Sequence, residues 1–244
     1  SPNKHNQFFL TVEPLEDSVA ESIAQKEIPE GRIKKKDKTL DEKLVALGIS
    51  RDEAGQYRNI YKGSVFLDKT KGEVHIGEVI ELVLDSFEQV MDQGPLAREP
   101  CIRLKVSLVD LKLHEDAIHR GPAQVYPAIR EAIRAAFFKA SPNLFEPVQT
   151  HQIESPNDFM STVTQLVSGK RGMLIDVQQD AATATIKAEL PVQEMIGWTS
   201  DLRSATEGRG VSALMDQQFK KMPKDLQERV IKQIRDRKGL AENQ

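Results

Sequence analysis

The feature that most constrains the fold is a strand, a loop and a helix that follow one another between residues 102 and 137. Apolar and polar residues alternate over residues 102–108, which is the period of a half-buried β-strand. Ile129, Ile133 and Phe137 recur every four residues and predict an apolar helix face, with Pro127 suited to its first turn. The loop between them is rich in histidine, charge, glycine and proline, so burying it would leave polar groups unpaired. The sequence therefore predicts a loop at a wetted end of a domain, held by a rigid strand and helix.

Composition limits the class of protein. The 244 residues suffice for one large domain or two ordinary ones, and 39% hydrophobic with 29% charged residues is typical of a soluble globular protein. No apolar run is long enough to span a bilayer, so no membrane partner is expected. The single cysteine, Cys101, cannot form an internal disulfide, which favours a reducing, cytoplasmic location. The net charge of −3 argues against a whole-surface nucleic-acid binder, so RNA contact requires a local positive region.

The turn-forming residues at 140–143 predict a boundary between two domains, residues 1–140 and 141–244, and an α+β fold class. The basic run at 31–38 is interpreted as a solvated surface, with an RNA role left open. The first domain is expected to hold a strand at 8–12, a short helix capped by Asp17 or Ser18, short helices within 28–60, a strand at 64–67, a helix at 76–93, and the strand, loop and helix described above.

The second domain shows a more regular pattern. Pro147 interrupts a strand at 144–149 and predicts that this strand lies at a sheet edge. Residues 155–158 (SPND) match a helix start, and Gly169 matches its end. A hairpin at 173–190, a helix from Pro191 to about Ala205, a strand at 211–219 and a helix from Pro223 follow. The order βαββαβ is that of a ferredoxin-like fold with one added helix.

Two functional alternatives follow from the residues alone. A metal-dependent hydrolase could use His114 and His119, but they are five residues apart, about 140° around a helix axis, and no third ligand is evident. A generic RNA-binding module would bind bare RNA with salt-sensitive affinity. Cys101 lies at the start of the predicted strand, where a packing role is favoured over a nucleophilic one. Residues 168–172 (SGKRG) lack the spacing of a phosphate-binding loop, so GTP hydrolysis is not expected.

Residues 114–124 (HEDAIHRGPAQ) resemble the archaeal branch of the elongation factor 2 family of ribosomal translocases. Pro122 and Ala123 stand where eukaryotic members usually carry two glycines. Further blocks that resemble the family follow in the same order at 1–6, 65–72, 94–96, 191–195, 201–209 and 237–240. The resemblance implies a C-terminal fragment with the family's fourth and fifth domains. These would be an elongated α/β domain similar to a ribosomal-protein fold and then the ferredoxin-like domain.

The resemblance also implies roles for individual residues. His119 matches the histidine that the family converts to diphthamide at the imidazole carbon between the nitrogens. The other residues of the implied ribosome- and RNA-contacting tip are Pro2, Asn3, Lys4, His5, His114, Arg120 and Gly121. Asp116 and Gln124 are interpreted as loop organisers. Arg203 and Arg209 are implied to contact the ribosome, and capping of a helix end around Gly208 is the alternative.

The function that the resemblance implies is that of the C-terminal part of a GTP-dependent translocase. Its tip would enter the small-subunit decoding region and stabilise the moving tRNA–mRNA duplex. The expected partners are the ribosome, including its stalk base, tRNA with mRNA, and the diphthamide-synthesis enzymes. The chain is expected to be monomeric and to catalyse no reaction itself. No cofactor is expected, because GTP and Mg²⁺ would belong to a G domain outside these residues.

Overall fold

The computed structural model describes residues 1–71 and 76–240. The chain divides into two compact units, each with its own core. Unit 1 comprises Ser1–Pro142 together with the segment from Ile231 onward, and unit 2 comprises Asn143–Val230. Among the described residues, no helix combines the length and the apolar character needed to cross a bilayer. The predicted two-domain α+β class is confirmed.

Unit 1 is built on one five-stranded sheet of order β1-β5-β4-β3-β2, in which β4 and β5 are parallel and the other neighbours antiparallel. Helix α4 connects the two parallel strands. The elements are β1 (Gln7–Pro14), α1 (Asp17–Ala24), β2 (Gly31–Arg32), α2 (Lys38–Ala46), α3 (Arg51–Ala54), β3 (Tyr57–Tyr61), β4 (Ser64–Asp68), α4 (Ile76–Asp92), β5 (Leu104–Lys112), the 3₁₀ turn η1 (Ala117–Arg120) and α5 (Pro122–Lys139).

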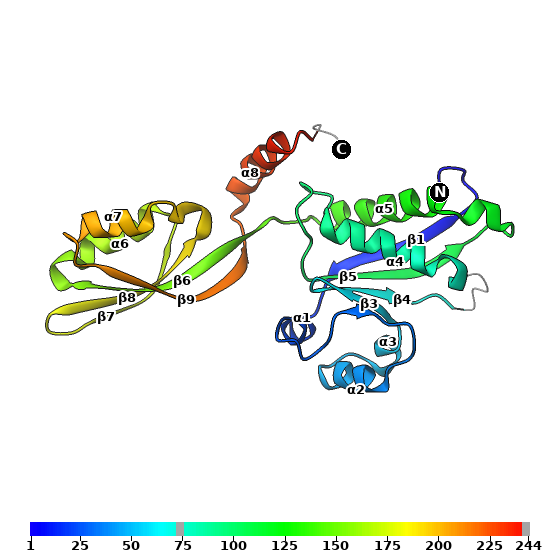
Figure 1. Cartoon of the computed structure of the whole chain (residues 1–244), viewed down its shortest axis with the longest axis horizontal. Coiled ribbons are helices and arrows are strands. Elements are labelled where there is room, and N and C mark those ends of the chain that lie inside the picture. Colours follow the sequence, from blue (N-terminus) through cyan, green and yellow to red (C-terminus); the bar gives the residue numbers. More distant parts are fainter. Residues whose placement is uncertain (72–75, 241–244) are drawn as a thin grey trace. The chain divides into compact units, whose positions relative to one another are not determined.

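Helices cover both faces of this sheet (Figure 1). Strand β4 shows why, because it is buried on both sides and its residues alternate between two cores. Phe66 packs in the core formed with α4 and α5, whereas Val65 and Leu67 pack in the core formed with α1, α2 and α3. The sheet is therefore the middle of three layers.

Several predicted boundaries in unit 1 are wrong. Helix α5 begins at Pro122, five residues before Pro127, and Gly121 is its N-cap. Both prolines suit a first turn, and Pro127 is instead accommodated inside the helix. Strand β5 begins at Leu104 rather than at residue 102, because Arg103 adopts a left-handed φ of 54°. The N-cap of α1 is Glu16 without a side-chain hydrogen bond, so neither Asp17 nor Ser18 caps it. Strand β3 was not predicted.

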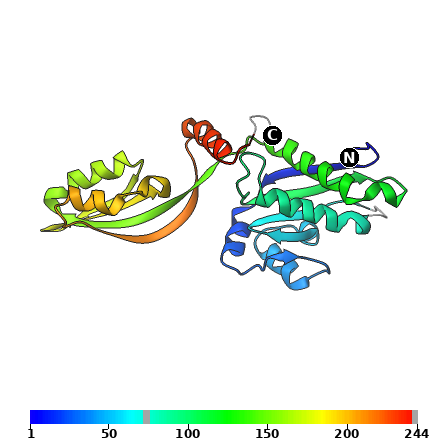
Figure 2. The same ribbon diagram turned by 45° about the horizontal axis from the view of Figure 1, so that its top comes forward.

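Unit 2 has a four-stranded antiparallel sheet of order β7-β8-β6-β9, with α6 and α7 on one face (Figure 2). The predicted βαββαβ order is confirmed. The elements are β6 (Phe145–Pro156), the 3₁₀ turn η2 (Asn157–Phe159), α6 (Met160–Gly169), β7 (Met173–Gln179), β8 (Thr183–Pro191), the 3₁₀ turn η3 (Val192–Met195), α7 (Trp198–Ala205) and β9 (Val211–Lys221). Helix α8 (Lys224–Arg237) begins in unit 2 and continues into the segment assigned to unit 1.

Three predictions based on proline in unit 2 are wrong. Strand β6 lies between β8 and β9 and is not an edge strand. Its pairing with β8 begins at Val148, so Pro147 has a neighbouring strand on one side only and its missing N–H is tolerated. Ser155 is buried within β6 and does not cap a helix. Pro191 ends β8, and Gly197, at a φ of 80°, separates η3 from α7 where one helix was expected.

Cys101 has the packing role that the sequence favours. Its side chain is buried, and its Sγ lies 3.7 Å from the carbonyl oxygen of Val90. Burial raises the pKa of the thiol to about 12, so little thiolate forms at neutral pH. We expect a disulfide reagent such as dithionitrobenzoate to leave Cys101 unmodified for minutes at pH 8 and to modify one equivalent in guanidinium chloride. Complete reaction of the folded protein within seconds would contradict this packing.

Candidate functional site

Two loops meet at one end of unit 1 because β1 and β5 are antiparallel neighbours. Gln7, the first residue of β1, pairs with Lys112, the last residue of β5. The chain segments beyond these two residues therefore emerge side by side at the same end of the sheet. We call residues 1–6 and 113–121 the tip. Helix α5 starts directly after the tip and packs against β1 within the same core.

Asn6 holds the two loops of the tip together. Its side chain is 1% exposed. Its Nδ2 donates a hydrogen bond to the carbonyl oxygen of His119 at 2.7 Å, and its Oδ1 accepts one from the backbone N–H of His114 at 3.0 Å. Sequence reasoning did not identify this role. The signal available was one amide residue directly before a strand, which is too common to be specific.

Arg120 is also buried, at 7% exposed. Its Nη1 donates to the carbonyl oxygens of His114, at 2.8 Å, and Glu115, at 3.1 Å, and its Nη2 pairs with Glu78 of α4. These bonds fix the histidine loop from inside. The resemblance implies an RNA contact for Arg120, and this burial argues against a direct contact of its guanidinium with RNA.

Asp116 and Gln124, predicted to organise the loop, each accept a hydrogen bond from a backbone N–H of the tip. The Asp116 carboxylate caps η1 by accepting a hydrogen bond from the N–H of Ile118 at 3.1 Å. The Oε1 of Gln124, in the first turn of α5, accepts from the N–H of Asn3 at 3.0 Å. Gly121 is the N-cap of α5 in extended backbone. Residues 1–6 are thus bonded to α5, the helix that follows residues 113–121.

Three imidazoles gather on the tip. The rings of His5 and His114 are stacked, with centroids 4.7 Å apart and 21° between their planes. The ring of His119 meets both edge-on, at 4.4 Å and 4.5 Å. Desolvation, together with repulsion from His119 and His114, lowers the pKa of His5, so the His5 ring favours its neutral form. His5 is exposed, whereas His119 is partly buried and less free in water than the sequence suggested.

The exposed part of the tip also includes Pro2 and Lys4. Lys4 has a left-handed φ of 61° and directs an ammonium group into solvent beside His5. Asn3 is partly buried, and its Oδ1 accepts hydrogen bonds from the Ser1 hydroxyl and the N–H of His5. The tip therefore offers a partner Lys4 and the three imidazoles, together with the exposed side chains of Glu115, Asp116 and Ile118.

The cluster bears directly on the metal alternative. The sequence offered no third ligand, and the structure supplies one in His5, since one nitrogen of each ring lies within 4.8 Å of the others. However, Nδ1 of His114 accepts a hydrogen bond from the N–H of Asp116 at 3.0 Å. The neutral ring then carries its proton on Nε2, so neither nitrogen is free to bind a metal until that bond breaks. The cluster is not a preformed metal site.

The two arginines proposed for unit 2 lie around the end of α7, and both are exposed. The carbonyl oxygen of Arg203 accepts a hydrogen bond from the N–H of Gly208 at 2.7 Å, and Gly208 has a φ of 80°. This is the helix-closing geometry that was the alternative for this segment. The guanidinium of Arg209 lies over the ring of Phe159 at 4.5 Å and pairs with Glu207 at 3.2 Å. A ribosome contact for Arg203 and Arg209 stays a prediction.

Comparison with known proteins gives two family matches in sequence order. Residues 25–141 match the family described as "Elongation factor G, domain IV", and residues 143–240 match "Elongation factor G C-terminus". Proteins named elongation factor 2 are similar over nearly the whole chain. The one from Nanoarchaeum equitans is 49% identical over 98% of this chain, the one from Pyrococcus furiosus 47% over 100%, and the one from Methanosphaera stadtmanae 44% over 99%. The chain spans about a third, 33%, of the length of each of these relatives.

Proposed function

This chain belongs to the family of elongation factors G and 2, of which it carries domain IV and the C-terminal domain, and we propose that it acts in ribosomal translocation. In this proposal the tip enters the decoding region of the small subunit and stabilises the tRNA–mRNA duplex as it moves. The observation that carries the proposal is the pair of loops held by Asn6, which presents Lys4 and His119 together at the end of a rigid sheet.

The chemistry of the tip suits an RNA partner. Lys4 offers a solvated charge for a phosphate, and the imidazoles offer hydrogen bonds and flat faces to unpaired or irregular RNA. A small cluster of this kind acts locally while the chain as a whole stays acidic, at net −3. Because the tip is fixed by a sheet and a helix, it resists displacement when pushed against a partner. Rigid presentation is this chain's contribution, and no bond-making step is assigned to it.

GTP hydrolysis, with its Mg²⁺, would reside in a separate G domain of the intact factor. We also propose contact of Arg203 and Arg209 with the stalk base of the ribosome, where their exposed guanidinium groups would meet RNA or protein. A cytoplasmic, monomeric factor fits this role. A metal-dependent hydrolase is the weaker alternative, because the histidine cluster needs His114 to give up its hydrogen bond to Asp116 before it can hold an ion.

We propose that His119 is the site of diphthamide modification by the diphthamide-synthesis enzymes. Its backbone is fixed by Asn6, while part of the ring remains accessible to an enzyme. The modification would add a long polar arm with a cationic centre to this ring. Intact-mass and fragment analysis of the protein from its native source is expected to find the added mass on the peptide that contains His119. An unmodified peptide from that source would refute the assignment.

Replacing Lys4 or His119 is expected to slow translocation by about tenfold, the effect of losing about 1.4 kcal/mol of stabilisation in the moving complex. The variants are Lys4→Asn, which tolerates the left-handed backbone, and His119→Gln, both in the intact factor. Single-turnover translocation and reading-frame maintenance are the measurements. Ribosome-dependent GTP hydrolysis should stay unchanged, because the substituted residues lie outside the G domain that would carry it out. Gln7→Ala, an exposed change just outside the tip, is the control. Unchanged rates in both tip variants would count against the proposal.

A further inference from the structure

A cleft in unit 1 lies between the basic run and the start of α4, and the proposed tip function does not use it. Its volume is about 520 Å³. Five cationic side chains line it, those of Arg32, Lys34, Lys35, Lys36 and Arg58, against two carboxylates, those of Asp68 and Glu81. Arg32 and Arg58 lie within ion-pair distance of carboxylates, so the three lysines carry the positive charge of the cleft, on a chain whose net charge is −3. A local reversal of charge of this kind marks a surface that attracts anions.

The three lysines are available to a partner. Lys34, Lys35 and Lys36 are exposed. Within residues 1–71 and 76–240, no carboxylate lies within ion-pair distance of any of their ammonium groups. Arg58 is different, because its guanidinium is held by the carbonyl oxygens of Gly55 and Tyr57. The lysines thus supply free charge at the rim of the cleft.

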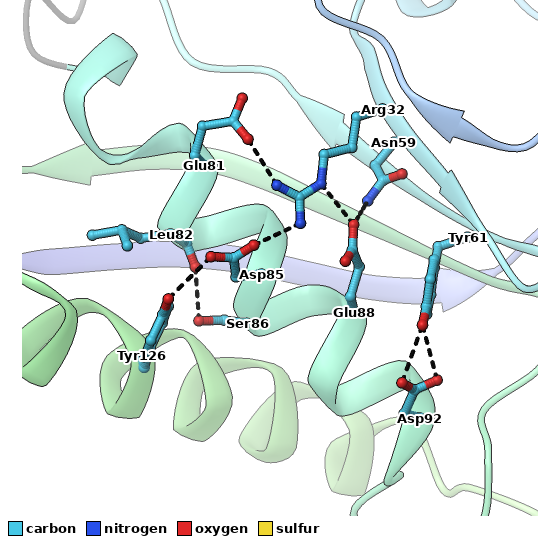
Figure 3. Close-up of polar contacts among 10 residues, drawn as sticks. All are labelled: Arg32, Asn59, Tyr61, Glu81, Leu82, Asp85, Ser86, Glu88, Asp92 and Tyr126. Carbon is cyan, nitrogen blue, oxygen red and sulfur yellow. Dashed lines mark hydrogen bonds and ion pairs between the residues drawn. The ribbon is translucent and has the colours of Figure 1, made fainter.

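The carboxylates of α4 do not pair with these lysines, because they form ion pairs with Arg32 instead (Figure 3). Its Nη1 pairs with Glu81 at 2.7 Å, its Nη2 with Asp85 at 2.6 Å and its Nε with Glu88 at 2.7 Å. Asn59 also donates to Glu88, at 2.8 Å. Hydrogen bonding to Arg32 lowers the pKa of Asp85 and of Glu88, so these two carboxylates stay ionised and paired with Arg32 at neutral pH.

The same contacts fix the segment that carries the lysines. The segment begins after Arg32, which is clamped to α4 by its three carboxylates. It ends at Asp37, whose side chain caps α2 by accepting from the N–H groups of Thr39 and Leu40. Between these two anchors, the N–H of Ile33 donates to the carbonyl oxygen of Arg58 at 2.8 Å. The lysines are thus carried on a short segment anchored at both ends, which reduces the entropy lost on binding.

We propose that this cleft binds the phosphate backbone of an RNA strand through Lys34, Lys35 and Lys36. Three exposed lysines next to one another in sequence, at the edge of a cleft, suit a chain of phosphates, and they require no particular base sequence. The choice of RNA over an acidic protein rests on the proposed function, which places this chain on the ribosome. The contact is separate from the tip and would add a second, sequence-independent attachment.

The test measures RNA binding by the 244-residue chain. Fluorescence anisotropy of a labelled RNA hairpin gives the affinity at increasing KCl concentrations. Wild-type protein is expected to bind with a Kd on the order of 10⁻⁵ M or tighter at low salt. The variant Lys34→Gln/Lys35→Gln/Lys36→Gln should bind about tenfold or more weakly there. It should also reduce the slope of log affinity against log salt by about 2 to 3, because each phosphate contact contributes about 0.9.

The matched control is Lys112→Gln/Lys139→Gln/Lys187→Gln, which removes the same charge from three other exposed lysines. Thermal unfolding of both variants should match wild type, because no removed side chain is buried. Equal salt slopes in the two triple variants would overturn the proposal, as would the absence of wild-type binding at low salt. Competition by polyglutamate as strong as by RNA would assign the cleft to an acidic protein instead. The tip is intact in all these proteins, so failure of the tip proposal appears only in the translocation measurements.

Discussion

Replacing Lys105 by methionine is expected to lower the free energy of unfolding by about 3 kcal/mol. The Lys105 side chain is 7% exposed, and its Nζ lies 3.0 Å from Glu53 and 3.5 Å from Glu13 and also bonds Glu16. Methionine fills a similar volume but leaves these carboxylates clustered without their cation. We place the loss at the lower end for a broken buried pair, because Glu13 and Glu16 still reach water. Urea denaturation at pH 7, followed by circular dichroism, measures it.

The loss should shrink as the pH falls. Burial desolvates Glu53 and opposes its ionisation, but hydrogen bonding and charge from Lys105 and Lys69 outweigh this and lower the pKa of that carboxyl. A carboxyl with a lowered folded-state pKa stabilises the fold above its unfolded-state pKa, and this contribution is lost as the pH falls through the folded-state value. Wild-type protein therefore loses this stabilisation in acid, and the Lys105→Met variant has little of it to lose.

The control for Lys105 is Lys112→Met on the same strand, which is exposed and should change stability by no more than about 0.5 kcal/mol. Adding Glu16→Gln and Glu53→Gln to Lys105→Met should restore more than about 1 kcal/mol, because the repulsion is then removed. A Lys105→Met variant within about 1 kcal/mol of wild type would show that the three carboxylates do not depend on this cation.

The variant Asn6→Ala is expected to release the two tip loops from each other. It leaves the carbonyl oxygen of His119 and the N–H of His114 without their partner, at a cost of about 2 kcal/mol. Hydrogen–deuterium exchange at the His114 amide should then accelerate by roughly thirtyfold, while the amides of the β5 interior stay unchanged. In the intact factor, translocation should slow at least as much as in Lys4→Asn, because every exposed tip group loses its fixed position.

Asn6→Asp separates the two bonds of this side chain. Aspartate still accepts from the N–H of His114, but it cannot donate to the carbonyl oxygen of His119. Protection at His114 should therefore partly survive in this variant. Gln7→Ala is the matched control, because Gln7 is the exposed neighbour at the start of β1. Full protection of His114 in Asn6→Ala would mean that the loops are held by other contacts.

The elements that could be predicted from the sequence are those in which burial and periodicity agree. Helix α4 was expected at 76–93 and is found at Ile76–Asp92, because one apolar face repeats along its whole length. The predictions based on proline were wrong because proline is compatible with several local structures. Pro122 and Pro127 both fit a first turn, and Pro191 fits the end of a strand as well as the start of a helix. Contacts with residues distant in the sequence decide between these options, so the local sequence cannot.

The site was predictable in its chemistry but not in its contacts. The histidine loop was recognised from residues close in sequence, and the contact of Asp116 lies within it, whereas Gln124 bonds Asn3, 121 residues earlier. That His5 meets His114 depends on the pairing of β1 with β5, whose partners are about a hundred residues apart. The burial of Arg120 likewise depends on Glu78 of α4, 42 residues earlier. Such long-range contacts leave no periodic signal.

Cross-linking from position 118 tests whether the tip reaches the decoding region. The Ile118 side chain is 77% exposed beside His119, so Ile118→Cys accepts a photoreactive maleimide, while the buried Cys101 does not react. Met173→Cys, at an exposed position of unit 2, is the control, and any cysteines outside these residues are replaced. In ribosome complexes of the intact factor, we predict cross-links from position 118 to decoding-region RNA, mRNA or tRNA that are absent from position 173. Cross-links from position 118 confined to the large subunit would contradict it.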